Sequence, residues 1–246
     1  SQHNYVKFQL TALSFLQYFV WGAWLITVGK YCTITMKWSF TDFGAIFTTM
    51  GISSIFMPSL MGIVADKWIN AERLLGILHG LSGISVACLP LVKDPTWFFW
   101  LTLLAMIFYM PTIALSNSVS YSILGKFRLD PIKTFPPIRV FGTVGFIAAM
   151  WVTDLTGNSA SENQFYISAL CSLGLAVFSF LLPNCPPNKN SIQGKSLAQI
   201  LGLDAFKLKL EKDFFCDVNI RNAQSSLLSN DLILETKFNF NLFDGL

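Results

Sequence analysis

Six long apolar stretches in the first 182 residues set what this chain can fold into. They run through residues 10–29, 43–65, 74–92, 97–123, 138–155 and 165–182. A helix needs about 20 mostly apolar residues to cross the hydrocarbon core of a bilayer. The stretches are apolar on all sides and lack the alternation at every second residue that strands of a membrane barrel require. They therefore predict an all-α membrane protein, with residues 1–182 forming a bundle of six transmembrane helices.

Composition supports the membrane assignment and narrows the function. Only 13% of the 246 residues are charged, against 53% hydrophobic, and a soluble domain needs more charge to cover its surface. Lys and Arg form no run interleaved with aromatic residues, so we expect no nucleic-acid partner. We find no nucleophile–base pair, no metal-ligand cluster and no phosphate loop, and we expect neither an enzyme nor a bound metal or cofactor. The first apolar stretch is too long for a cleaved signal peptide.

The distribution of Lys and Arg predicts the orientation in the membrane. Cytoplasmic connectors carry an excess of these residues. The connectors on one side hold seven of them (Lys7, Lys67, Arg73, Lys126, Arg128, Lys133 and Arg139), and those on the other side hold three (Lys30, Lys37 and Lys93). We therefore expect both ends of the six-span block to be cytoplasmic.

The rest of the chain differs in character from the six spans. A Pro- and Asn-rich segment at 183–190 breaks the last helix, and residues 196–208 are typical of a short amphipathic helix at the membrane interface. We interpret 183–208 as a cytoplasmic linker. Five of the fourteen acidic residues fall within 211–235, and we interpret 209–246 as a polar tail that is out of frame or disordered.

Two groups of residues are candidates for function. Gly62, Asp66 and Lys67 end the second span, where a charged pair at the membrane surface can stabilise one conformation of a transporter; a charged helix terminus that only stops the span is the alternative. Arg139, Thr143 and Phe146 fall at i, i+4 and i+7 and so share one helical face of the fifth span. They offer donors for oxygens and a ring for stacking, although Arg139 could also be a plain interfacial anchor.

Two polar residues inside the spans, Gln17 and His79, are also candidates for function. We expect Gln17, in the first span, to take part in substrate binding. His79 in the third span could relay protons or could be a neutral imidazole bonded to a neighbouring helix. No Asp or Glu lies well inside any span, so a carboxylate that couples transport to protons is not expected in this part of the chain.

Several longer motifs, in order, resemble the bacterial nucleoside:proton symporter family of the major facilitator superfamily. They are Leu13-Ser-Phe-Leu-Gln17-Tyr-Phe-Val-Trp21-Gly-Ala-Trp24, Phe56-Met-Pro-Ser-Leu-Met-Gly62-Ile-Val-Ala-Asp66-Lys67-Trp68, Tyr109-Met-Pro-Thr, Phe135-Pro-Pro-Ile-Arg139 and Leu201-Gly-Leu-Asp-Ala-Phe206. The superfamily's loop signature is only partly kept, because Ile69-Asn70-Ala71 stands where Gly and basic residues are usual.

The resemblance implies a fold, a function and a cellular location. The fold is the N-terminal half of a two-bundle transporter. The function is proton-driven uptake of purine and pyrimidine nucleosides across the bacterial inner membrane by alternating access, with Arg139, Thr143 and Phe146 on the N-terminal face of the site. The partners are then nucleosides, protons, membrane lipid and a C-terminal six-helix half.

The resemblance also implies that something further is needed for transport. A complete family member would continue from Phe206 into six more spans, whereas the chain turns polar there. Two bundles must move around a site between them, so we expect no transport by this chain alone. The alternatives are a half-transporter that needs a partner chain, a six-helix homodimer, and a membrane fragment that transports nothing. A homodimer would bring two Arg139 side chains together without an intramembrane carboxylate, which is unfavourable.

Overall fold

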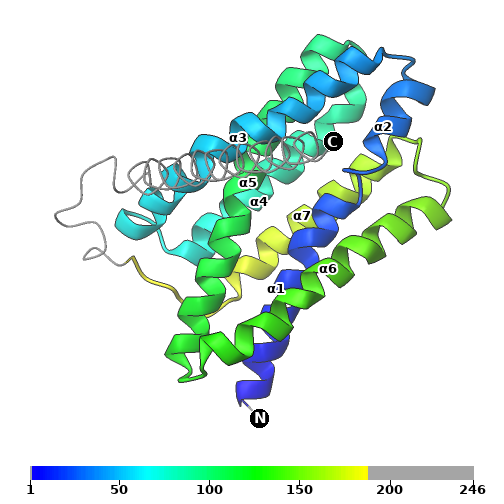
Figure 1. Cartoon of the computed structure of the whole chain (residues 1–246). Helices are drawn as coiled ribbons and strands as arrows, with labels where there is room; N and C mark the ends of the chain where they lie inside the picture. The colour runs from blue at the N-terminus through cyan, green and yellow to red at the C-terminus, as the bar shows by residue number, and fades with distance from the viewer. Residues whose placement is uncertain (1, 188–246) are drawn as a thin grey trace, which may run out of the picture. The chain divides into compact units, whose positions relative to one another are not determined.

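A computed structural model of the chain describes residues 2–187. The predicted amphipathic helix at 196–208 and the predicted tail at 209–246 lie outside the described residues. The described part is helical, as Figure 1 shows. Its helices are α1 (Gln2–Gly22), α2 (Val28–Lys30), α3 (Phe40–Lys67), α4 (Ala71–Cys88), α5 (Pro95–Lys126), α6 (Pro131–Leu155) and α7 (Asn163–Phe180), with a π-helical turn at Tyr31–Thr35 and a 3₁₀ turn at Leu89–Leu91.

Five of the described helices are long and apolar enough to cross a membrane: α3, α4 with the 3₁₀ turn that follows it, α5, α6 and α7. They correspond to the second to sixth apolar stretches, and the predicted all-α membrane fold is confirmed. The first stretch forms a less regular element. Helix α1 begins at Gln2 and so includes several polar residues, and it ends at Gly22 before the apolar stretch is complete.

Backbone groups at the irregular end of the first span still form hydrogen bonds. The Val28 amide donates to the Trp24 carbonyl at 2.7 Å, and the Tyr31 amide donates to the Thr27 carbonyl at 3.2 Å. The Thr27 hydroxyl donates to Gln164 Oε1 of α7 at 2.7 Å. Such pairing allows non-helical backbone at membrane depth, where an unpaired polar group would be costly.

Three acidic residues fix where helices begin. Asp42 and Ser39 form a capping box at the start of α3. Asp94 accepts from the Thr96 amide at 2.9 Å at the start of α5, and Asp130 accepts from the Ile132 amide at 3.0 Å at the start of α6. A side-chain oxygen at this position satisfies an amide that has no partner within its own helix.

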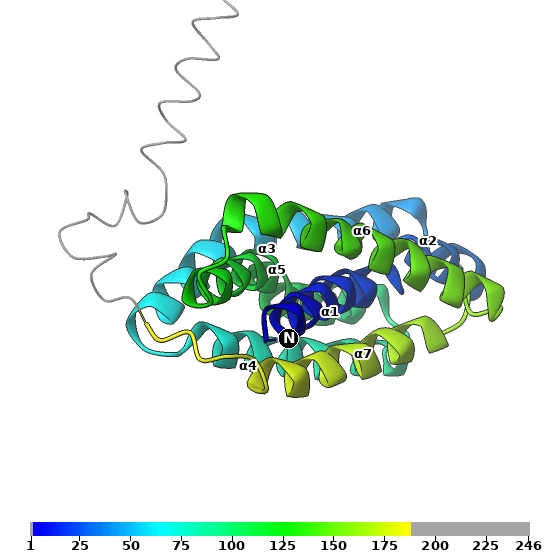
Figure 2. The same cartoon turned by 90° about the horizontal axis from the view of Figure 1, so that it is seen from below.

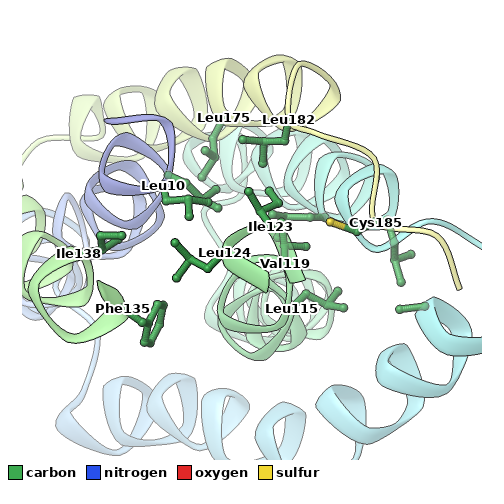
Figure 3. Packing of buried hydrophobic residues seen from close by; sticks show 14 of the residues in the cluster. Leu10, Leu115, Val119, Ile123, Leu124, Phe135, Ile138, Leu175, Leu182 and Cys185 are labelled. Atoms are coloured by element: carbon green, nitrogen blue, oxygen red, sulfur yellow. The ribbon is translucent and has the colours of Figure 1, made fainter. Parts of the chain in front are cut away.

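Helix α1 lies between α6 and α7, while α4 packs against α5 and α7 and α3 packs mainly against α5 (Figure 2). One apolar cluster joins α1, α4, α5 and α7 through side chains such as Leu10, Ile123 and Leu175, which Figure 3 shows pointing toward one another. A second cluster, around Trp24 and Phe165, joins the end of the first span to α5 and α7. The two clusters leave α3 and α6 as the least buried of the five candidate spans.

Helices α1 and α6 approach each other at two glycines. A Cβ added to Gly22 would lie 2.5 Å from the Phe146 carbonyl oxygen, and one added to Gly145 would lie 2.9 Å from the Phe15 carbonyl carbon. Both distances are too short for carbon in van der Waals contact. Only glycine at these positions lets the two backbones come this close, which is a common way for membrane helices to pack.

The connectors form two groups at opposite ends of the bundle, as the sequence predicts. At one end Lys30 lies 3.5 Å from Asp154 and Lys93 lies 3.4 Å from Glu162. At the other end the Lys126 ammonium donates to the Asn184 carbonyl at 3.5 Å. The grouping is the predicted one, and the assignment of the second end to the cytoplasm remains a prediction.

Candidate functional site

A groove of about 500 Å³ runs along one flank of α6. It is lined by Phe135, Pro136, Arg139, Val140 and Thr143. The structure thus brings two of the predicted substrate-binding residues, Arg139 and Thr143, to one open surface. Phe146 lies about two turns beyond Arg139 on the same helix and is half-buried.

A tyrosine of α1 holds the Arg139 guanidinium. Arg139 Nη2 donates to the Tyr18 hydroxyl at 2.5 Å, and the guanidinium carbon lies 4.0 Å from the centre of the Tyr18 ring. The Tyr18 side chain is buried, with 8% of the residue exposed. A cation placed over an aromatic ring and bonded to its hydroxyl loses much of its freedom to move. The charge is therefore fixed at the α1–α6 contact, beside the groove.

Gly142 makes room for this pair. A Cβ at Gly142 would lie 2.7 Å from Arg139 Nη1 and 2.7 Å from Tyr18 Cδ2. Any larger residue would displace the guanidinium or the ring. The sequence analysis identified Arg139 but neither Tyr18 nor Gly142, since nothing in the sequence alone shows which residue of the first span faces the fifth.

Aromatic rings continue the same α1–α6 contact beyond Arg139. The Phe146 ring meets the Trp21 ring edge-on with centroids 6.3 Å apart, and Trp21 in turn lies 5.9 Å from Tyr109 of α5. Edge-to-face pairs at this separation are favourable. The Trp21 indole nitrogen is buried and has no hydrogen-bond partner among the described residues. The aromatic rings of Trp21 and Phe146 therefore pack at the same contact between α1 and α6 as Arg139 does.

Gln17, the fourth predicted substrate-binding residue, lies in the bundle core and not in the groove. It is 0% exposed. Its amide nitrogen donates to the Thr112 hydroxyl at 2.7 Å, and its amide oxygen lies 2.8 Å from His79 Nε2. The hydroxyl of Tyr109 donates to the Gln17 carbonyl at 2.6 Å. Gln17 thereby ties α1 to α4 and α5.

His79 forms hydrogen bonds to neighbouring helices, which was one of the two roles considered for it from the sequence. Its Nε2 faces the Gln17 amide oxygen, and its Nδ1 lies 3.3 Å from the Ser172 hydroxyl of α7. The Ser172 hydroxyl also donates to the His79 carbonyl at 2.9 Å, so both the ring and the backbone of His79 contact α7. His79 is fully buried at 0% exposure, and its partners in the described residues are uncharged.

The predicted gating residues lie in the last turns of α3. Lys67 is its final residue and is exposed, and Asp66 is half-buried. A Cβ added to Gly62 would meet no atom within 4 Å. No other helix of residues 2–187 therefore approaches α3 closely at Gly62, and the position faces open space.

A buried carboxylate near this loop was not anticipated. Glu72 in the first turn of α4 is 2% exposed. It accepts from the Cys185 amide at 2.9 Å and from Asn70 Nδ2 at 3.2 Å, and the Ala71 amide donates to the Cys185 carbonyl at 3.2 Å. Glu72 thus fastens the segment after α7 to the start of α4, where an acidic side chain also suits the helix dipole.

The surroundings of Glu72 also affect the neighbouring thiol. Burial raises the pKa of Cys185 to about 11, and the nearby Glu72 charge contributes to the rise. Both effects disfavour a second negative charge at this point. The thiol therefore stays protonated at neutral pH.

The described residues thus form a helical membrane bundle with a fixed cation beside a groove on one flank. Sequence comparison gives the family: the model described as "Nucleoside H+ symporter" matches residues 5–229. The chain belongs to this family, and it is a multi-pass membrane protein and not an enzyme.

Relatives and solved structures agree with the family. The chain is 45% identical over 203 residues to a xanthosine permease of Escherichia coli K12, covering 82% of this chain and 48% of the permease. It is 42% identical over 203 residues to the nucleoside permease NupG of the same organism, with the same coverage. The crystal structure of the nucleoside transporter NupG superposes with a TM-score of 0.77 at 41% identity, covering 86% of this chain and 52% of that one.

A variant of the same transporter gives a TM-score of 0.81 at 42% identity, covering 84% of this chain and 51% of that one. The chain spans about half the length of the curated relatives it matches. The fold prediction of an N-terminal half of this architecture is thereby confirmed.

Proposed function

We propose that this chain forms the N-terminal half of a nucleoside transporter, and that Arg139, Thr143 and Phe146 form its side of the substrate site. The observation that carries the proposal is the Arg139 guanidinium, held by Tyr18 beside a groove that Thr143 also lines. A cation that is already oriented loses less entropy when it binds a ligand.

Each group suits a part of a nucleoside. The guanidinium and the Thr143 hydroxyl offer donors to sugar or base oxygens. The Phe146 ring, supported edge-on by Trp21, offers a surface against which a purine or pyrimidine can stack. The groove is open on one side, so a second bundle is needed to enclose the ligand.

Proton coupling requires groups from outside the described bundle. The carboxylates of residues 2–187 lie at helix ends or in connectors: Asp42, Asp66, Glu72, Asp94, Asp130, Asp154 and Glu162. A proton-coupling carboxylate usually lies within the membrane near the substrate. We assign that role to the second six-helix half.

The complete transporter takes up purine and pyrimidine nucleosides together with protons across the bacterial inner membrane, by alternating access. Both ends of residues 1–182 are then cytoplasmic. Gly62, Asp66 and Lys67 act in gating, at the end of a helix whose flank is open. The chain alone does not transport, because it offers half a site and no second bundle to move against. A membrane fragment without transport activity is the competing function.

Uptake in cells without their own nucleoside carriers tests the proposal. The chain is expressed alone, and together with the C-terminal half of the Escherichia coli xanthosine permease, and uptake of radiolabelled uridine and adenosine is measured. We expect uptake only when both halves are present, with its loss on adding an uncoupler and in the Arg139→Ala variant. Co-purification of the halves checks their assembly. Assembled halves that take up no nucleoside would favour the competing function, and uptake by the chain alone would refute the need for a second half.

A further inference from the structure

A second groove lies between α1 and α6 at the end of the bundle where α1 begins. Its volume is about 290 Å³. Two lysines and two threonines line it together with apolar side chains, and the polar pairs come one from each helix: Lys7 and Thr11 from α1, Lys133 and Thr134 from α6.

This groove is separate from the proposed nucleoside site. Phe141 and Pro137 form part of its wall, whereas Arg139 and Thr143 line the first groove. Successive residues of a helix are turned by about 100°, so Phe141 points about 160° away from Arg139. The two grooves therefore open on opposite flanks of α6.

The groove is positively charged. Neither Asp nor Glu lines it. The ion pairs of residues 2–187 use Lys30, Arg73 and Lys93, so neither Lys7 nor Lys133 has a carboxylate partner among the described residues. Two ammonium groups around one small space repel each other unless an anion lies between them.

The apolar part of the groove indicates what kind of anion fits. Phe141 is 46% exposed and Pro137 is also exposed, and both lie further along α6 toward the middle of the membrane than Lys133 does. An anion bound by the lysines would thus have an apolar surface directly on its membrane side. A phosphate that continues into acyl chains satisfies both halves of the groove.

We propose that this groove binds the phosphate headgroup of an anionic phospholipid in the leaflet where α1 begins. The two lysines neutralise the phosphate, and the Thr11 and Thr134 hydroxyls donate to its oxygens. Bound in this way, the lipid bridges α1 and α6. The site does not depend on nucleoside transport, so it stands even if the proposed function fails.

Lipid binding to the full chain tests the proposal. The purified chain is mixed with phosphatidylglycerol or with zwitterionic phosphatidylethanolamine, and bound lipid is counted by native mass spectrometry. Each basic residue near an anionic headgroup contributes about fivefold to affinity, so the Lys7→Gln, Lys133→Gln double variant is expected to bind phosphatidylglycerol about 25-fold more weakly. The matched control is the Lys30→Gln, Lys93→Gln double variant, which removes two lysines at the opposite end and should bind as the unchanged chain does.

Two measurements on the unchanged chain keep the test independent of any variant's folding. A photoactivatable phosphatidylglycerol should crosslink to peptides containing residues 7–11 and 133–141. Inorganic phosphate should not raise the melting temperature as phosphatidylglycerol does. Equal binding of the two lipids, equal losses in both double variants, crosslinks only elsewhere, or equal stabilisation by inorganic phosphate would each overturn the proposal.

Discussion

Replacement of Gly145 by alanine is the sharpest test of how α1 and α6 hold the site. The added Cβ would lie 2.9 Å from the Phe15 carbonyl carbon and 3.1 Å from Phe15 Cα. These are backbone atoms of α1, so no side chain can rotate out of the way and the two helices must move apart. Overpacking of this kind costs about 1–3 kcal/mol, while alanine favours a helix over glycine by up to about 1 kcal/mol. We expect a net loss of about 1–2 kcal/mol.

A matched control separates crowding from helix propensity. Gly174 in α7 has nothing within 4 Å of an added Cβ, so Gly174→Ala keeps the gain in propensity without the clash. A loss of 1 kcal/mol lowers the melting temperature by about 2–4 °C in a chain of this size. By circular dichroism in detergent, we expect Gly145→Ala to melt about 2–8 °C below the unchanged chain and Gly174→Ala to melt at or above it. Equal melting temperatures for the two variants would refute the close approach of α1 and α6.

Three further predictions concern polar contacts. Tyr18→Phe keeps the ring but removes the hydroxyl that binds Arg139. A hydrogen bond to a charged group contributes about 1.5–3 kcal/mol, so nucleoside binding by the assembled halves should weaken about 10- to 150-fold. Unchanged affinity in equilibrium binding would contradict the positioning role. Gln17→Leu removes the partner of a buried imidazole and should lower the melting temperature, whereas weaker nucleoside binding at an unchanged melting temperature would instead support direct substrate contact. Because the pKa of Cys185 is raised to about 11, its maleimide labelling should keep rising about tenfold per pH unit up to pH 10 as the thiolate forms, and Glu72→Ala should speed labelling at pH 7. A rate that levels off near pH 9, as for an ordinary thiol, would refute the raised pKa.

The sequence was enough to predict the class of fold because the membrane imposes it. Five of the six apolar stretches became helices that meet the length and composition needed to span a bilayer, since each must satisfy its backbone internally. The helix formed by the first apolar stretch ends before the stretch itself does. Its backbone leaves regular helix after Gly22, and the break is supported by the Thr27–Gln164 hydrogen bond to a residue 137 positions away, which no local pattern reveals.

The candidate site was predicted in part, for a similar reason. Spacing along one helix showed that Arg139 and Thr143 share a face, and the structure places both on one groove. The residues that hold them came from other helices. Tyr18 meets Arg139 across 121 positions of sequence, and Gly142 matters only because Tyr18 lies opposite it.

The surroundings of two polar side chains also depend on contacts between helices. Gln17 looked like a free polar group in a span, but buried partners on α4 and α5 occupy its amide. Glu72 was not singled out from the sequence, and the structure buries it against a segment 113 positions later. Burial of a polar side chain depends on tertiary packing, which hydropathy does not encode.

The central claim, that α6 forms one wall of a nucleoside site, is tested most directly by photoaffinity labelling. The chain assembled with a complementary half is irradiated with azido-adenosine, and the labelled peptides are mapped by mass spectrometry. We predict labelling within residues 135–146 that excess uridine prevents and that Arg139→Ala strongly reduces. Labelling that uridine does not prevent, or that maps to other helices and leaves residues 135–146 unmodified, would contradict the claim.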